Sequence, residues 1–147
     1  MGVKTAEIEV EKREEDLYVT KITKEVQDEI NKSRFRSGIA TIFIGCTTAS
    51  ISTMEYNPES IKHMREALER VAPSDGHYLH NTSVGDSNGY GADDNGKSHV
   101  RSAIMGPSIT IPFSDGKLML DKPLEIVLLD FDIIKRNRKV IIQLMGE

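Results

Sequence analysis

Alternating apolar and charged residues predict strands near the beginning of the chain. In residues 5–13, Ala6, Ile8 and Val10 alternate with charged side chains. This period of two is typical of a half-buried strand. Residues 17–22 alternate in the same way. We therefore expect two short strands before the first helix.

Helical spacing marks three other segments. Residues 24–34, after a capping Thr23, carry apolar side chains on one face, and Asn57 followed by Pro58 is typical of a helix start. A third, short helix is expected over residues 98–105. The apolar positions of the first two helices are Val26, Ile30, Ile61, Met64, Leu68 and Val71.

The remaining apolar segments predict a mainly β protein. Residues 38–44 are rich in β-branched side chains and predict a central strand, with residues 51–54 as its neighbour. Four more strands are expected at residues 109–113, 117–120, 124–131 and 138–145. Most connections are short enough for hairpins, so the pattern predicts an α+β fold over residues 1–147. We expect one domain, a mainly antiparallel sheet or sandwich with two or three helices.

Between residues 81 and 96 the chain has almost no apolar side chains and is rich in Gly, Asn, Ser and Asp. A loop of this length inside a compact domain is usually functional or disordered. The loop ends at Gly96-Lys97-Ser98, which completes a GxxxxGK[ST] pattern beginning at Gly91. The surrounding pattern lacks a preceding parallel strand, so we expect a looser anion site at this helix start rather than a nucleotide hydrolase.

Charge and composition narrow the function classes. The 147 residues include 19 Lys and Arg against 23 Asp and Glu, a net charge of −4. A mildly acidic chain is a poor general partner for nucleic acid. The basic group Lys135, Arg136, Arg138 and Lys139 is expected to be a solvated turn. A single cysteine, Cys46, excludes an internal disulfide. With no signal peptide or membrane span in the pattern, we expect a cytoplasmic protein that does not bind membranes.

Two histidines flank the polar loop and are the sharpest candidates for chemistry. His80 precedes it and His99 follows it, so the loop could bring both imidazoles together as an acid/base pair or as ligands of a transition metal. Asp94 is a further candidate ligand, for Mg²⁺ held together with a phosphate. Surface histidines and solvated aspartates remain the alternative interpretation.

A second candidate segment is Cys46-Thr47-Thr48, which follows the expected strand of residues 38–44. Chains that leave the end of a strand often present their side chains to a ligand. The two hydroxyls could bind phosphate, and Cys46 could act as a nucleophile or as a soft metal ligand. A buried cysteine beside strand threonines is the alternative.

These segments occur in an order that resembles a known family. The order is Thr47-Thr48-Ala49-Ser50, Glu55-x-x-Pro58, Tyr78-x-His80, the polar loop, Ser98-His99-Val100, Gly106-Pro107-Ser108, Ile111-Pro112-Phe113 and Asp115-Gly116-Lys117-Leu118. From about residue 5 to residue 146 it resembles the YjbQ family, whose members are described as secondary thiamine-phosphate synthase enzymes. The resemblance implies an α+β fold of antiparallel sheets and a homotrimer. It also implies the coupling of an aminopyrimidine diphosphate to a thiazole phosphate, with loss of pyrophosphate.

The resemblance places family site positions at Cys46, Thr47, Thr48, His80, His99 and Ser108, and the other candidates follow from the residues of the loop and the helix start. The catalytic candidates are His80, His99 and Cys46; the metal candidates are His80, His99 and Asp94, for Mg²⁺ or another divalent ion; the substrate or phosphate candidates are Thr47, Thr48, Asn95, Lys97, Ser98, Arg101 and Ser108. Two positions depart from the family pattern. Cys46 replaces a family histidine, and residues 121–125, Asp-Lys-Pro-Leu-Glu, replace a Gly-Thr-Trp-Gln stretch. The alternatives to the synthase are a metal-dependent hydrolase of a phosphorylated small molecule and a non-catalytic trimer that binds an anion.

Overall fold

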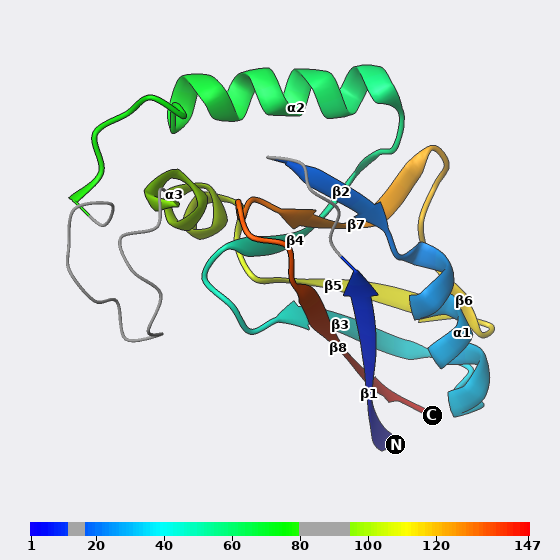
Figure 1. Ribbon diagram of the computed structural model, residues 1–147. Helices are drawn as coiled ribbons and strands as arrows, with labels where there is room; N and C mark the ends of the chain where they lie inside the picture. Colours follow the sequence, from blue (N-terminus) through cyan, green and yellow to red (C-terminus); the bar gives the residue numbers. More distant parts are fainter. Residues whose placement is uncertain (12–16, 80–94) are drawn as a thin grey trace.

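The computed structural model describes residues 1–11, 17–79 and 95–147 (Figure 1). Within these residues the chain forms eight strands and three helices. The elements in chain order are β1 (Gly2–Glu11), β2 (Tyr18–Lys21), α1 (Thr23–Ser33), β3 (Gly38–Ile44), β4 (Ala49–Glu55), α2 (Pro58–Val71), α3 (Gly96–Met105), β5 (Ser108–Ser114), β6 (Lys117–Leu118), β7 (Leu124–Asp130) and β8 (Asn137–Gly146).

The strands form two sheets in which every pair is antiparallel. A five-stranded sheet has the order β1-β8-β3-β5-β6, and a three-stranded sheet has the order β2-β7-β4. The predicted antiparallel α+β fold is therefore confirmed. Its central strand, β3, also has the predicted bounds.

One predicted pairing is wrong, because β4 is not a neighbour of β3. β3 pairs with β5 and β8, whereas β4 pairs with β7 in the other sheet. Ile44 at the end of β3 and Ile51 in β4 are both buried in the core between the sheets. Residues 45–48 therefore carry the chain from one sheet to the other. Alternation within each strand cannot distinguish such a crossing from a hairpin.

The main core lies between the two sheets and is closed on one side by α1. Val26 and Ile30 of α1 are fully buried in it. The other fully buried or nearly buried members include Ala40, Ile42, Ala49, Ile111, Phe113, Ile126, Leu128, Val140, Ile142 and Leu144. Burying such aliphatic side chains, each contributing about 1.5–3 kcal/mol, supplies the main driving force for joining the sheets.

A second core lies on the other face of the smaller sheet, where α2 covers it (Figure 1). Leu68 of α2 is buried there with Ile61 and Met64 packed nearby, as the helical spacing predicts, but the prediction for Val71 is wrong, because it lies at the last position of the helix and is 61% exposed. β7 contributes to both cores, because Ile126 enters the first and Val127 the second. This strand is buried on both faces and therefore reads as a continuous apolar run.

The two predicted helix caps, Asn57 for α2 and Thr23 for α1, have different outcomes. The side chain of Asn57 accepts a 2.8 Å hydrogen bond from the Ser60 amide, so Asn57 caps α2 as predicted. Thr23 does not cap α1, because the N-cap is Ile22. The Thr23 hydroxyl instead donates to Glu125 and accepts from the Ile126 amide, which ties α1 to β7. Among the helices of the described residues, none combines the length and apolarity needed to cross a bilayer.

Candidate functional site

Several element ends meet at one end of the sandwich. The end of β3 lies beside the starts of β5 and β8, since Phe43 pairs with Ser108 and Ile44 pairs with Val140. The start of β4 lies beside the end of β7, since Ala49 pairs with Asp130. The first turn of α3 packs on the same end (Figure 1). The Thr-Thr segment and the segment that follows the polar loop are thereby brought together.

A buried ionic network occupies this end of the sandwich. Arg138 donates from Nε to Asp130 Oδ2 at 2.7 Å and from Nη2 to Asp130 Oδ1 at 2.9 Å. Its Nη2 also donates to Thr48 Oγ1 at 2.8 Å, and Thr48 Oγ1 donates to Asp132 Oδ2 at 3.1 Å. Arg136 reaches Asp132 at 3.0 Å. Two guanidinium groups and two carboxylates thus balance in charge around the Thr48 hydroxyl.

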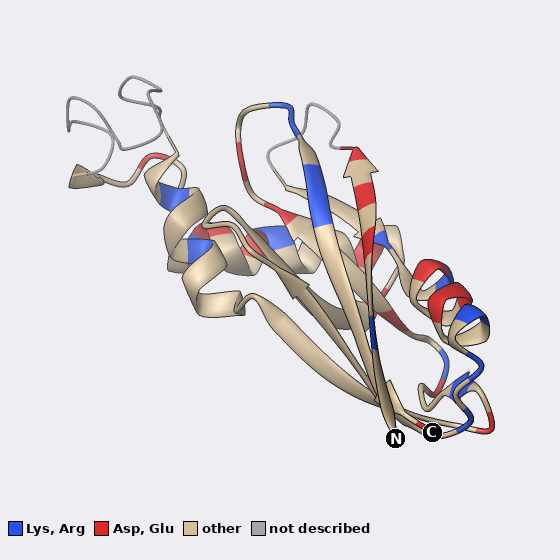
Figure 2. Cartoon of the chain, turned by 90° about the horizontal axis from the view of Figure 1, so that it is seen from below, with Lys and Arg blue, Asp and Glu red and all other residues tan. Residues whose placement is uncertain are grey.

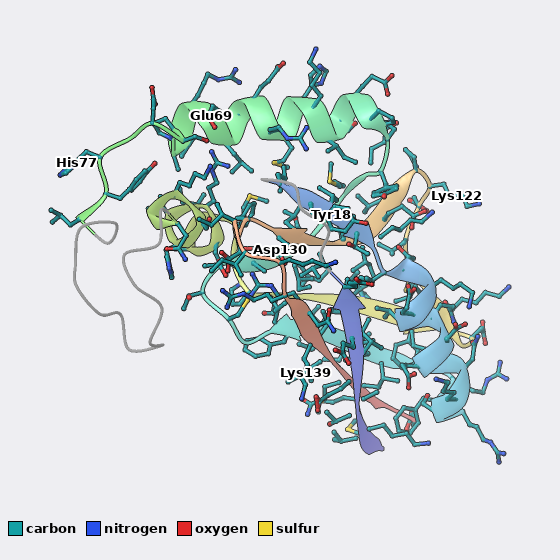
Figure 3. The ribbon with its side chains drawn as sticks, viewed as in Figure 1. Tyr18, Glu69, His77, Lys122, Asp130 and Lys139 are labelled. Carbon is teal, nitrogen blue, oxygen red and sulfur yellow. The ribbon has the colours of Figure 1, made fainter. Side chains whose placement is uncertain are left out.

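The network favours a charged Arg138. Burial lowers the pKa of Arg138, but the hydrogen bond and charge of Asp130, together with Cys46 and Asp132, outweigh that effect and raise the pKa above the ordinary value of an arginine. The guanidinium is therefore a fixed cation. Its donors are directed at Asp130 and Thr48, so it positions the start of β4. Figure 3 shows Asp130 where α3 and β8 approach each other.

This network was not predicted from the sequence, and the expectation for Arg138 was wrong. Arg138 is only 4% exposed, whereas Lys135 and Lys139 are exposed as predicted for a solvated turn. The signal was present in β8, where Arg138 is in phase with the buried Val140 and Ile142. An arginine on the apolar face of a strand needs a buried partner, and two aspartates lie just upstream of it.

Serine side chains attach α3 to this end of the sandwich. Ser98 Oγ donates to the carbonyl of Phe131 at 2.5 Å, while the Phe131 amide donates to the Thr48 carbonyl at 3.0 Å. Ser102 Oγ donates to the Ala49 carbonyl at 2.7 Å. Ser50 Oγ in turn donates to the Ser102 carbonyl at 3.1 Å. The helix is therefore held on β4 by polar contacts that require short side chains.

Two predicted phosphate ligands on α3 lie against the segment that follows α2. Arg101 is 1% exposed and donates from Nε and Nη2 to the Ala72 carbonyl, and its Nη2 also reaches Glu69 at 2.8 Å. Lys97 Nζ donates to Ser74 Oγ at 3.0 Å. Figure 3 shows Glu69 at the end of α2 nearest α3. Arg101 therefore connects α3 to the end of α2, and both cations connect α3 to the segment after α2.

The remaining described candidates lie near the network. His99 is half-buried in the first turn of α3, next to Ser98. Cys46 is half-buried, and Thr47 is exposed where the chain crosses between sheets. Ser108 is exposed at the start of β5. The side chains that this end offers to a ligand are therefore small, polar or nucleophilic.

Asn95 is a special case among the predicted binding residues. It is the N-cap residue of α3 and is 4% exposed. Its side chain makes no capping hydrogen bond, and its Oδ1 has no hydrogen-bond partner within the described part of the chain. Because an unpaired buried acceptor costs about 1–3 kcal/mol, it is a natural place for a ligand donor.

The predicted metal ligands are mostly outside the described residues. His80 and Asp94 both lie there, so their predicted roles stay predictions. Across residues 1–11, 17–79 and 95–147, no group of three His, Cys, Asp or Glu side chains is arranged to hold a metal ion. Of the three predicted ligands, His99 alone lies among the described residues, so the predicted metal site stays a prediction.

Comparison with known proteins agrees with the fold and the order of these segments. The family described as UPF0047 protein YjbQ-like matches residues 6–147. A UPF0047 protein of Methanocaldococcus jannaschii is 29% identical over 142 residues, which are 96% of this chain and 92% of the relative. The UPF0047 protein YjbQ of Escherichia coli O157:H7 is 27% identical over 128 residues, which are 86% of this chain and 87% of the relative.

Solved structures show the same architecture. A YbjQ-like protein of unknown function from Sulfolobus solfataricus superposes with a TM-score of 0.88 at 23% identity, covering 99% of both chains. An uncharacterised YjbQ/UPF0047 protein from Clostridium acetobutylicum gives a TM-score of 0.82 at 27% identity, covering 95% of this chain and 99% of that one. The chain therefore belongs to the UPF0047 YjbQ-like family.

Proposed function

We propose that this protein is a thiamine-phosphate-synthase-like enzyme that joins an aminopyrimidine diphosphate to a thiazole phosphate. The resemblance described above supports this activity. One observation supports the location of the site: Thr48 and Ser98, which are far apart in the sequence, both bond to the backbone of Phe131. The Thr48 carbonyl accepts from the Phe131 amide, and Ser98 Oγ donates to the Phe131 carbonyl. The Thr-Thr segment and the His99 turn therefore share one end of the sandwich.

The reaction requires little acid/base chemistry from the chain. The thiazole nitrogen donates its electron pair to the methylene carbon of the pyrimidine, and the C–N bond forms. The bond from that carbon to the diphosphate oxygen breaks, and pyrophosphate leaves with the electron pair. The protein must align the two substrates and stabilise charge that develops on the leaving group. Thr47 and His99 are assigned to donate hydrogen bonds to that group.

Other residues are assigned to positioning. Thr48, fixed by Arg138 and Asp132, holds Thr47 and Cys46 at the edge of the site. Asn95 Oδ1 is assigned to accept a hydrogen bond from the amino group of the pyrimidine, which would satisfy its unpaired oxygen. Lys97 and Arg101 act on the site by fixing α3 against the segment after α2, rather than as direct phosphate ligands.

The metal, the assembly and the compartment are part of the proposal. Mg²⁺ characteristically binds through substrate phosphates and few protein carboxylates, so we assign it to the diphosphate. A homotrimer is supported by the face of the five-stranded sheet that points away from the core. There Val3, Ile39, Phe43 and Met145 are 38–58% exposed on neighbouring strands. Exposed apolar groups of this kind are typical of interaction surfaces. The expected location is the cytoplasm.

The test is an assay of thiamine phosphate formed from the two purified substrates and Mg²⁺. Wild-type protein should form product, and His99→Ala and His80→Ala should each lose at least about tenfold in kcat/KM, as expected for lost charge stabilisation. His63→Ala is the matched control, because His63 is exposed on α2. Equal activity of His99→Ala and wild type would remove His99 from the site.

The alternative functions give different readouts in the same experiment. A hydrolase would release phosphate or pyrophosphate from one substrate alone, and chelation would abolish the release. A binding module would be stabilised against heat by the phosphorylated compounds without turnover. Absence of coupled product from folded protein, judged by its circular dichroism, would reject the synthase proposal.

A further inference from the structure

A second candidate binding site lies at the end of the sandwich opposite α3. A cleft of about 700 Å³ opens between the C-terminal half of α1 and the β5–β6 hairpin. Its volume lies within the range of small-molecule sites, about 300–1,000 Å³. Figure 2 shows basic residues gathered at the end of α1 beside this hairpin.

The walls of the cleft are cross-linked. Gln27 of α1 donates to the Gly116 carbonyl at 2.7 Å and accepts from the Leu118 amide at 3.0 Å. The Gly116 amide donates to the Arg36 carbonyl at 2.8 Å. Asp115 and Gly116 have φ angles of 50° and 73°, as in the tight two-residue turn that joins twisted strands. A ligand would therefore meet a largely preformed shape, which lowers the entropic cost of binding.

The charge of the cleft is unbalanced toward positive. Arg34, Arg36 and Lys117 line it, and Asp115 is the only acid among its lining residues. Asp115 is engaged by Arg36 at 2.6 Å. Within the described residues, Arg34 and Lys117 have no salt-bridge partner. Two cations are thus available to a ligand from opposite walls, one from the end of α1 and one from β6.

The floor of the cleft adds an apolar contact. Ile30, Phe35 and Leu118 line it together with the amide of Gln27. Phe35 is half-buried beside Gly2 and Gly146, where a Cβ on either glycine would lie 3.1–3.3 Å from the phenylalanine. The phenylalanine is therefore packed beside these glycines, with Lys4 Nζ 5.6 Å from the centroid of its ring, and it also lines the cleft, where it can contact a planar group.

We propose that this cleft binds a small organic anion that carries a phosphate or carboxylate on an apolar or planar group. Arg34 and Lys117 contact the anionic group, and Phe35 and Leu118 contact the apolar group. This site does not depend on the proposed synthase activity. Its residues come from α1, the segment between α1 and β3, and the β5–β6 hairpin, and none of them belongs to the end of the sandwich that carries Thr48 and α3.

The test is a titration of ¹⁵N-labelled protein with phenyl phosphate, followed by NMR. Saturable shifts are expected at the amides of Gly116, Leu118 and Gln27. Inorganic phosphate, which lacks the ring, and benzyl alcohol, which lacks the charge, should each bind more weakly. The Arg34→Gln/Lys117→Gln variant should bind phenyl phosphate about tenfold more weakly, since it loses two partly exposed ionic contacts.

The control removes two charges elsewhere. Lys24→Gln/Lys62→Gln changes exposed lysines of α1 and α2 that pair with Asp28 and Glu66. This control should bind phenyl phosphate as the wild type does. The proposal is overturned if the cleft amides do not shift, if Arg34→Gln/Lys117→Gln binds unchanged, or if both variants weaken binding equally. Unchanged shifts for the other amides of Arg34→Gln/Lys117→Gln establish that it is folded.

Discussion

The two ends of the sandwich hold arginine–carboxylate pairs of nearly equal length in opposite surroundings. At the α3 end, Arg138 meets Asp130 at 2.7 Å, with side chains 5% and 2% exposed. At the α1 end, Arg36 meets Asp115 at 2.6 Å, with side chains 77% and 78% exposed. Distance therefore cannot rank these pairs, whereas burial can.

The buried pair at the α3 end stabilises the fold, whereas the exposed charges at the α1 end can bind a ligand. A buried pair leaves a costly unpaired ion when one partner is removed, so Arg138 at the α3 end serves the fold and is not available to a ligand. An exposed pair contributes little and is screened by salt. Cations at the α1 end can therefore exchange water for a ligand. Between these extremes, Arg101 is 1% exposed and its partner Glu69 is 44% exposed.

The largest effect is expected at the buried pair. Asp130→Asn removes the charge that faces Arg138 and should lower the free energy of unfolding by about 3 kcal/mol or more. Urea denaturation followed by circular dichroism measures it. Asp115→Asn makes the same chemical change at the exposed pair and is the control. Similar losses in the two variants would contradict the ranking by burial.

The hydroxyl inside the network gives the next effect. Thr48→Val keeps the shape but leaves Arg138 and Asp132 each without one hydrogen bond, at an expected cost of about 1–3 kcal/mol. Thr47→Val, at an exposed position, should change stability by less than about 0.5 kcal/mol. Thermal unfolding of both variants makes the comparison. If Thr47→Val were as unstable as Thr48→Val, the stability would not depend on the hydrogen bonds of Thr48 with Arg138 and Asp132.

The pair of Arg101 with the half-exposed Glu69 predicts that the free energy of unfolding depends on pH. The hydrogen bonds from the Ser74 amide and hydroxyl, with a smaller contribution from Arg101, lower the pKa of Glu69 below 4.5. A depressed pKa means that the carboxylate stabilises the fold fully above pH 4.5 and loses that contribution as the pH falls through the folded-state pKa.

Glu69→Gln should therefore be less stable than wild type at neutral pH, by about 1 kcal/mol or less. The difference should shrink on acidification below the ordinary pKa of a glutamate. Chemical denaturation at a series of pH values measures it. A difference that stays constant across this range would mean that the charge of Glu69 is not what holds Ser74 and Arg101.

The smallest effect is expected at the exposed pair. Arg36→Gln should lower the free energy of unfolding by about 0.2–1 kcal/mol in low salt, and the loss should disappear as salt is added. Asp130→Asn, in contrast, should be nearly insensitive to salt. A loss in Arg36→Gln that persists in high salt would show that the backbone contact of Gly116 with Arg36 depends on the side chain.

Much of the fold followed from local sequence because the decisive signals are local. Asn57 and Pro58 specify a helix start through one side-chain hydrogen bond and one fixed backbone angle. The β-branched run of β3 needs no distant partner to be recognised. The pairing of β4 with β7 depends instead on which sheet the chain joins after residues 45–48. That choice is set by tertiary packing.

The candidate site was predicted less completely for the same reason. Thr48 and Ser98 were identified as site residues, and the structure brings their segments together. Arg138 was missed because a basic run usually indicates solvent, and its carboxylate partners come from a different strand end. His80 and Asp94 lie outside the described residues, so their part of the site stays a prediction.

The pairing of β1 with β8 has a consequence for how the protein is made. It joins Gly2 to Gly146 across nearly the whole sequence, and β8 also lies between β1 and β3. During synthesis, β1 therefore cannot pair until β8 has been made, and one edge of β3 stays unpaired until then. Contacts this distant in sequence favour slow folding. Nascent chains are most exposed to edge-to-edge association just before β8 emerges from the ribosome.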